Sequence, residues 1–274
     1  MHFMMNPDAV YLYPIWTVGL LLIGLAVGGA VTIELLARRF LPLALRRSHN
    51  DVAAAMFSVI GVTYAVLLAF VAMLAWETFN QAKAASWEEA GAIRILAAAT
   101  MELPGAAAAG AHAATAAYAR MVVNTEWPAQ AAGRAAGGAG RLLDRVARIA
   151  AGVPDGAGKS RMLSALDGLW RARQLRLLAA QSEVPGIVWL VLLLGGGLTI
   201  AFGSFLGSPS LAMHLAMSSA LAVSGALVLL LVLALGHPFR GDFRVSTAPY
   251  VAVLRTITPP PGPGARPAAA TIPQ

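Results

Sequence analysis

The sequence predicts an all-α membrane protein with four transmembrane helices and a helical soluble insert between the second and the third. Three observations lead to this fold class. The mean hydropathy of the 274 residues is +0.69 and 12% of them are charged, about half the charged fraction of an ordinary soluble domain. Four apolar stretches reach the roughly 20 residues that a spanning helix needs. The long segment between the second and third stretches carries charges along its length.

The first two spans are expected at Pro14–Ala37, where Glu34 is the one charged residue, and at Val52–Trp76. The other two are expected at Pro185–Gly207 and Leu211–Leu235, and the short turn between them makes them antiparallel neighbours. Each must be a helix, because lipid offers no partners for backbone N–H and C=O groups. The first span is expected to be retained, since the first 30 residues contain no Lys or Arg and the apolar run exceeds a signal-peptide core.

The insert is expected to be helical. Glu77–Leu103 lacks a helix breaker, so it should continue span two as one long helix ending at Pro104. A second helix is expected over Ala106–Glu126, stopping at Pro128. An Ala/Gly-rich linker and two further helices follow, at Ala129–Gly140, Arg141–Ala151 and Ser160–Glu183.

We therefore divide the chain into four parts. Residues 1–76 hold an N-terminal tail and spans one and two, and residues 77–184 form the soluble insert. Residues 185–235 hold spans three and four. Residues 236–274 form a C-terminal tail that ends in a Pro-rich, disordered stretch.

Several function classes are disfavoured. The chain has no cysteine, which excludes disulfides, thiolate metal sites and cysteine nucleophiles. Its five histidines lack the i, i+4 spacing of helical metal ligands, and we find no catalytic constellation. Gly152–Ser160 resembles a phosphate-binding loop, but Val153 stands where the motif needs a glycine. We therefore expect no enzymatic activity, no cofactor and no metal.

The net charge of +7 favours contact with anionic lipid headgroups at the span ends over nucleic acid as a partner. An acid inside a span is a candidate functional group. Glu34, however, precedes Arg38 by one helical turn near the interface. A snorkelling ion pair is therefore favoured over a proton relay.

Small residues occur at spacings that matter for helix contacts. The pairs Gly24/Gly28 and Gly203/Gly207 allow close helix approach, and Gly61 of span two is a further packing candidate. One face of span two is made almost wholly of small residues: Ala54, Ser58, Gly61, Ala65, Ala69 and Ala72. Such a face could line a pore if several copies surround an axis, although periodicity alone favours close packing.

Three segments resemble a family of bacterial bestrophin-like membrane proteins. They are Phe57–Phe70 with Trp76–Ala82, Tyr118 with Glu126–Pro128, and His237–Ser246. The resemblance extends from about Asn50 to Leu254. Bestrophins have four spans with a large helical region between the second and third, and their second span lines the pore of a pentameric ion channel.

The resemblance thus implies a homo-oligomer, a pentamer, that conducts ions across the bacterial inner membrane. Aligned through Gly61, the pore-lining positions would be Ala54, Ser58 and Val62. The alternative is a non-conducting membrane scaffold whose helical insert binds a partner. A transporter is disfavoured, because paired intramembrane charges and inverted repeats are not found.

Animal bestrophins hold calcium partly through acids that follow the last span. The matching segment here, Pro238–Ser246, offers one carboxylate, Asp242, between Arg240 and Arg244. Calcium needs six to eight oxygen ligands. We therefore expect no calcium site, and we expect Asp242 to pair with one of these arginines or to cap the turn at Gly241.

Four spans place both termini and the insert on one side of the membrane. Four arginines lie in the first link, against six basic residues near the spans on the other side: Lys83, Arg171, Arg173, Arg176, Arg240 and Arg244. The resemblance to bestrophins places the insert in the cytoplasm. A reporter that is active only in the periplasm should be inactive when fused after Gly236, and activity there would reverse the orientation.

Overall fold

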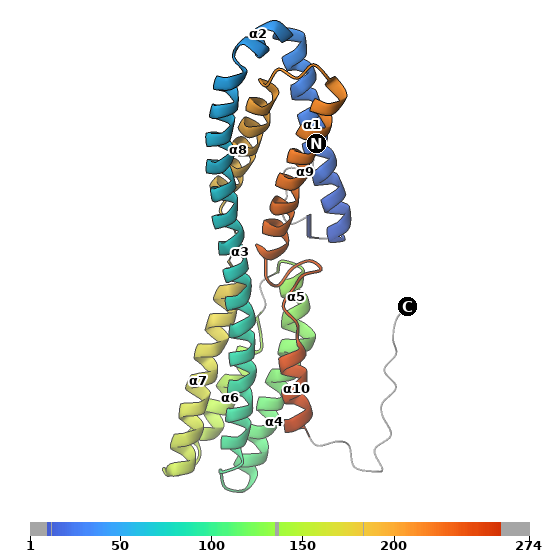
Figure 1. Cartoon of the computed structure of the whole chain (residues 1–274). Helices are drawn as coiled ribbons and strands as arrows, with labels where there is room; N and C mark the ends of the chain where they lie inside the picture. Colours follow the sequence, from blue (N-terminus) through green and yellow to red (C-terminus); the bar gives the residue numbers. More distant parts are fainter. Residues whose placement is uncertain (1–9, 12, 135–136, 183, 259–274) are drawn as a thin grey trace, which may run out of the picture. The chain divides into compact units, whose positions relative to one another are not determined.

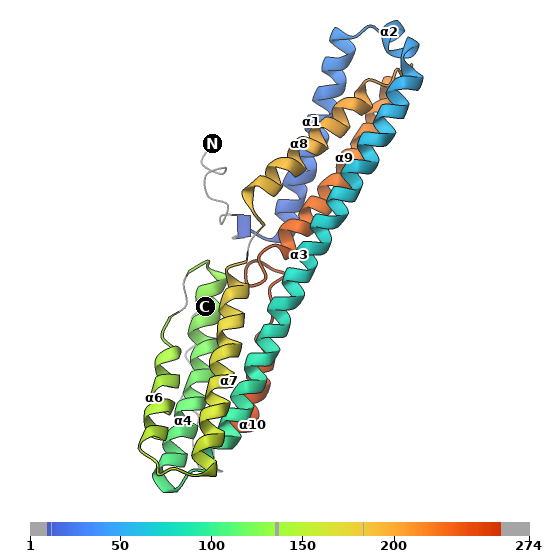
Figure 2. The ribbon, with the colours of Figure 1, turned by 90° about the vertical axis from the view of Figure 1, so that its left-hand side faces the viewer.

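The computed structural model describes residues 10–11, 13–134, 137–182 and 184–258, and over these residues the protein is helical without a strand (Figures 1 and 2). The helices are α1 Ile15–Phe40, α2 Leu43–Ser48, α3 Asn50–Thr100, α4 Gly105–Met121, α5 Trp127–Ala131, α6 Gly140–Ala151, α7 Ala157–Ala180, α8 Gly186–Ser204, α9 Leu211–Leu235 and α10 Ala248–Ile257, with a π-helical turn at Val122–Glu126 between α4 and α5.

The chain divides into two compact units. Unit 1 consists of Met1–Lys83 and Leu178–Val245, and unit 2 of Ala84–Leu177 and Ser246–Gln274. The expected insert limits were 77 and 184, a few residues outside those of unit 2. The first part of the expected C-terminal tail contains α10, which belongs to unit 2. The Pro-rich stretch from Pro259 lies outside the described residues.

Unit 1 confirms the four expected spans. Helices α1, α3, α8 and α9 are long and apolar enough to cross a membrane. Helix α9 has the expected bounds, and α1 continues past Ala37 because Arg38 and Arg39 are favourable at the negative end of the helix dipole. Helix α3 has 51 residues and runs unbroken (Figure 2), as its lack of breakers predicted.

The spans of unit 1 pack around an apolar core. Its buried members come from α3, α8 and α9: Leu68, Val71, Ala75, Leu192, Leu229, Val232 and Leu235. Helix α1 runs beside α9, and Gly19 gives room for Leu230. The Tyr64 ring lies on Gly195 and Gly196 of α8, and its hydroxyl donates to the Leu192 carbonyl at 2.9 Å. Because Gly195 and Gly196 have no side chains, α3 can approach α8 closely.

The link between α1 and α3 contains a short helix, α2, which the sequence did not suggest. The side-chain oxygen of Asn50, the first residue of α3, accepts a hydrogen bond from the Gly207 backbone N–H at 2.7 Å. Gly207 lies so close to the backbone of Arg47 that a Cβ there would be 2.8 Å from the Arg47 nitrogen. The α8–α9 turn therefore rests on the link between the first two spans.

In unit 2, α4 lies beside α6 and contacts α10. The expected end of the second insert helix at Pro128 is wrong. The chain continues through the π-helical turn into α5, where Pro128 occupies the first helical turn. Pro128 has no backbone N–H to donate, and it directly follows the π-helical turn, in which the Trp127 N–H bonds to the Val122 carbonyl. Helix α5 therefore runs to Ala131, into the segment expected to be a linker.

Three consecutive glycines of α8 give a matched test of the packing against Tyr64. A Cβ would lie 2.7 Å from the Tyr64 ring at Gly195 and 2.8 Å from the Tyr64 hydroxyl at Gly196, and it would meet nothing within 4 Å at Gly197. Gly195→Ala and Gly196→Ala should each lower the free energy of unfolding by about 1–3 kcal/mol. Gly197→Ala should leave it unchanged or raise it, because alanine favours the helix. Thermal unfolding of the purified protein in detergent measures the difference, and equal effects at all three positions would contradict this packing.

Candidate functional site

The spanning half of α3 has a surface that its own chain leaves uncovered. The three pore candidates of the sequence, Ala54, Ser58 and Val62, are all exposed there, Val62 to 65%. The Ser58 hydroxyl donates to the Ala54 carbonyl at 2.9 Å, so its proton is used within the helix. This side of α3 is therefore uncharged and weakly polar.

Two of the three candidates line a groove of about 790 Å³ between α1, α3, α8 and α9. Ser58 and Val62 are in its lining together with Gly61, whereas Ala54 is not. The lining is almost wholly apolar. The structure thus brings the small-residue face of α3 to an open groove within unit 1.

A second exposed side of α3 carries larger residues. Met56 is 53% exposed and Val59 is 65% exposed, and the Thr63 hydroxyl donates to the Val59 carbonyl at 2.8 Å. Both of these sides of α3 are therefore exposed in a single chain.

The glycine candidates for helix packing fall into two groups. A Cβ at Gly203 would lie 3.4 Å from the Phe57 ring, and one at Gly207 would meet the Arg47 backbone. A Cβ at Gly24, Gly28 or Gly61 would meet nothing within 4 Å. Of these candidates, only Gly203 and Gly207 lie in close contact with another helix or the link within one chain.

Glu34 lies at the centre of a buried polar cluster in unit 1. The expected pair with Arg38 is present, with 3.0 Å between Nε and the carboxylate. The pair does not snorkel, however, because Glu34 is fully buried. Arg46 and His214 also contact its carboxylate, at 3.1 and 3.2 Å, and α2 is the element that turns Arg46 inward.

Arg46 connects this cluster to the α8–α9 turn. Its guanidinium donates to the carbonyls of Ser204 and Leu206, the latter at 2.9 Å, and Arg38 donates to the Ser208 carbonyl at 3.2 Å. The cluster ties α1, α2, α8 and α9 together at one end of the spans. These contacts join four elements, which supports a structural role, and among the described residues the buried Nε and Nη1 of Arg46 have no hydrogen-bond partner.

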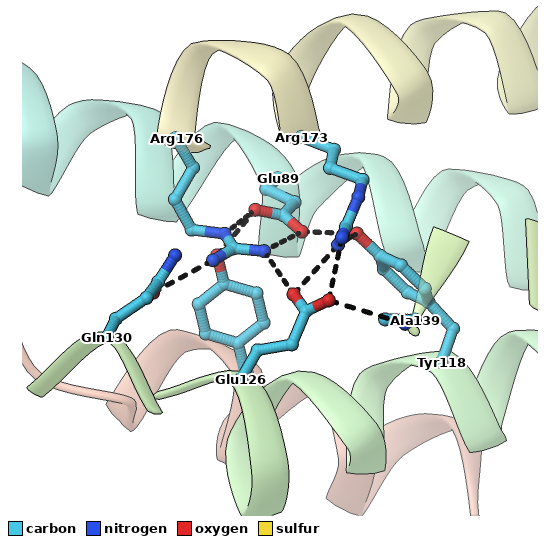
Figure 3. A network of polar contacts seen from close by, with 8 residues as sticks. Glu89, Tyr118, Glu126, Gln130, Ala139, Arg173 and Arg176 are labelled. Atoms are coloured by element: carbon cyan, nitrogen blue, oxygen red, sulfur yellow. Dashed lines mark hydrogen bonds and ion pairs between the residues drawn. The ribbon is translucent and has the colours of Figure 1, made fainter. Parts of the chain in front are cut away.

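Unit 2 encloses a larger polar network, which Figure 3 shows from close by. Glu126, in the π-helical turn, accepts two hydrogen bonds from Arg173 of α7, at 2.6 and 2.8 Å. Arg176, one turn further along α7, donates to Glu126 at 2.9 Å and to Gln130 of α5 at 3.0 Å. The backbone N–H of Ala139 donates to Glu126 at 3.3 Å.

Glu89 of α3 is the second carboxylate of the network. It accepts hydrogen bonds from the Arg176 guanidinium and from the hydroxyl of Tyr118 on α4. Tyr250 of α10 donates its hydroxyl to the same carboxylate at 2.9 Å. Two carboxylates thus face two guanidiniums, and six helical segments contribute to one buried, charge-balanced cluster.

Burial and neighbouring charges fix the protonation of this network. Burial raises the pKa values of the Tyr118 and Tyr250 hydroxyls far above their ordinary value, and the Glu89 carboxylate raises them further. Burial alone would raise the pKa of the Glu126 carboxyl, but hydrogen bonds and charges from Arg173 and Arg176 outweigh it and lower that pKa. At neutral pH, Glu126 is therefore ionised and both tyrosines remain hydrogen-bond donors.

Sequence reasoning missed this network. The available signal was on α7, where Arg173 and Arg176 follow Leu166 and Leu169 on the buried side of the helix. An arginine in a core position of a helix needs a buried partner of opposite charge, and the glutamates are residues that can supply it.

Two other sequence-derived sites have structural explanations. Asp242 was expected to pair with an arginine or to cap the turn at Gly241, and this is wrong: it accepts the Ile15 backbone N–H at 2.8 Å, at the start of α1. The first N–H groups of a helix lack intrahelical partners and favour a carboxylate.

The segment Gly152–Ser160, which resembles a phosphate-binding loop, closes on itself. The Lys159 ammonium binds the Val153 carbonyl and Asp155, both at 2.9 Å. Among the described residues, no three His, Cys, Asp or Glu residues are grouped to hold a metal.

The chain matches the sequence profile of the bestrophin-like domain over residues 24–250. The chain belongs to the bestrophin-like family. No curated protein matches it in sequence.

Solved structures share the fold of this bestrophin-like chain. A bacterial bestrophin homologue from Klebsiella pneumoniae, in a mutant form, aligns with a TM-score of 0.65 at 17% identity, covering 86% of this chain and 97% of that one. The same homologue, phased by zinc, aligns with a TM-score of 0.64 at 17% identity and the same coverage. A mutant of a protein described as a membrane protein gives 0.66, again at 17% identity, 86% and 97%. The four spans and the family together make this chain a membrane protein.

The network of unit 2 generates a test of its role. Arg176→Met should lower the free energy of unfolding by about 3–5 kcal/mol, because it leaves buried carboxylate charge without a cation. Tyr250→Phe should cost less, about 1.5–3 kcal/mol, since it removes one hydrogen bond to a charged group. Thermal unfolding in detergent is the measurement. Arg171→Met is the matched control on α7, because its pair with Asp167 is exposed and an exposed pair contributes at most about 1 kcal/mol. Equal losses for Arg176→Met and Arg171→Met would contradict the network's role.

Proposed function

We propose that the protein is an oligomeric ion channel of the bestrophin type, in which the spanning half of α3 surrounds the pore. The observation that carries the proposal is the exposed and uncharged side of α3, in a chain that belongs to the bestrophin-like family. One side of its spanning half is uncharged and exposed at Ala54, Ser58 and Val62, and Ser58 and Val62 line an open groove. By resemblance to bestrophins, the second span lines the pore and the oligomer is a pentamer.

The pore face that we propose contains Ala54, Ser58 and Val62. Successive members lie four residues apart, so they follow one side of the helix over about two turns. Small side chains there let several copies of α3 stand close to an axis and still leave room for an ion. The open glycines Gly24, Gly28 and Gly61 are proposed as contact points between copies, because no atom of their own chain fills the space beside them.

We place the protein in the bacterial inner membrane, with the insert and both described ends of the chain in the cytoplasm. The bilayer, further copies of the chain and the permeating ions are then its partners. No enzymatic activity is proposed, because the family resemblance is to ion channels.

Cysteine substitution tests the pore face on a background without native thiols. Ala54→Cys, Ser58→Cys and Val62→Cys should each react with a charged, water-soluble thiol reagent after reconstitution into liposomes. The reaction should reduce ion flux, because the attached group occupies the pore. Leu194→Cys on α8, 64% exposed and outside the groove lining, is the control that we expect to face lipid and not to react.

The second exposed side of α3 gives the contrasting outcome. Reaction at Met56→Cys, Val59→Cys or Thr63→Cys, with no reaction at the three proposed positions, would move the pore to that side of the helix. No reaction along the whole span, with no flux in the unmodified protein, would favour the alternative of a membrane scaffold whose insert binds a partner.

A further inference from the structure

The part of α3 that belongs to unit 2 has a face that its own chain leaves bare. Trp87 and Ile95 are 57% and 59% exposed on this face. Gly91 lies midway between them, and a Cβ there would meet nothing within 4 Å. We call this surface the α3 face: Trp87, Gly91 and Ile95, with Glu88 and Arg94 beside them.

This arrangement is unfavourable in a chain surrounded by water. A glycine in a helix interior costs roughly 1 kcal/mol relative to alanine, and no contact of its own chain requires one at position 91. Single exposed apolar side chains are common on proteins, but two large ones that flank an unfilled glycine on one helix face favour a contact surface. Trp87 and Ile95 each lie one helical turn from Gly91, so the three form a gap between two bulky groups, into which another helix can pack.

The charges beside the face have a defined order. Glu88 and Arg94 lie three residues before and three residues after Gly91. At 100° per residue they stand about 60° to either side of it, on opposite flanks. Within the part of the chain that the structure describes, neither forms an ion pair. One edge of the α3 face is therefore acidic and the other basic.

We propose that the α3 face is the contact surface for a second copy of this chain, with Glu88 of one copy facing Arg94 of the next. Copies inserted in one membrane with the same orientation have parallel α3 helices. Rotation about an axis along these helices brings the acidic flank of each copy to the basic flank of its neighbour, as in parallel coiled coils. An antiparallel arrangement would instead bring like charges together.

The proposal rests on the oligomeric part of the proposed function and deepens it, because it names a surface outside the spans. It does not depend on conduction. The pairing does not determine the number of copies, since the same pairing of flanks repeats in a ring of any size. That number depends on how the spans pack.

Charge reversal tests the pairing in the full chain. Glu88→Arg alone, or Arg94→Glu alone, should weaken association about tenfold or more, because each brings like charges together across the contact. The double variant Glu88→Arg with Arg94→Glu should restore it. The readout is the mass of the detergent-solubilised protein over a dilution series, measured by native mass spectrometry.

A pair of glycine variants separates association from folding. Gly91→Leu should reduce the oligomeric mass without lowering the melting temperature, because the new side chain fills space that its own chain leaves empty. Gly168→Leu on α7 is the matched control: a Cβ there also meets nothing within 4 Å, and the oligomeric mass should stay unchanged.

The outcomes are distinguishable. An oligomeric wild type whose mass is unaffected by the single charge reversals would overturn the α3 face and leave the channel proposal standing. The same holds if Gly91→Leu changes the mass no more than Gly168→Leu does. A wild type that is monomeric at every concentration would overturn both the α3 face and the oligomeric channel.

Discussion

Both units depend on one constraint, namely that a buried charge must be matched by an opposite charge at hydrogen-bond distance. In unit 1, Glu34 is matched by Arg38 and Arg46. In unit 2, Glu89 and Glu126 are matched by Arg173 and Arg176. Removing one member of such a set is costly, because the remaining charge cannot regain water. Hydrophobic packing alone would allow neighbouring helices to slide and rotate, whereas these pairs fix which turn of one helix faces which turn of the next.

The two clusters hold their elements in the same way. Each joins a charged side chain on a long helix to groups carried by short segments: α2 and the α8–α9 turn in unit 1, and the π-helical turn and α5 in unit 2. Short helices are unstable by themselves, because few backbone hydrogen bonds repay the cost of ordering the chain. Their position comes from the charges that they carry into a neighbour, as Arg46 shows in α2 and Glu126 in the π-helical turn.

The sequence predicted what a local rule controls. The four spans could be recognised because lipid demands a long apolar helix, and the length of α3 followed from the absence of a breaker between Asn50 and Thr100. Contacts between distant segments could not be derived in this way. Asp242 binds Ile15, 227 positions away, and an arginine two residues from Asp242 was the more obvious local partner. Pro128 misled for a related reason, since it follows a π-helical turn that no local residue pattern predicted.

The candidate site was also predicted only in its local features. The small-residue face of α3 could be read from spacing, but whether Ala54, Ser58 and Val62 meet a neighbour, a groove or water depends on how far α1, α8 and α9 stand from it. The partners of Glu34 depend on α2 turning Arg46 inward. Each of these is a property of the tertiary structure, which no residue pattern in one segment records.

The composition of unit 2 from two separate stretches has a consequence for biosynthesis. Residues 84–177 leave the ribosome well before α10, and α8 and α9 are made in between. The carboxylate of Glu89 therefore lacks the hydroxyl of Tyr250 until both later spans have been synthesised. Domains generally fold as units once their whole sequence is available, so unit 2 cannot complete its fold before α10 has been synthesised. Completion of this fold is therefore a late step in the synthesis of the chain.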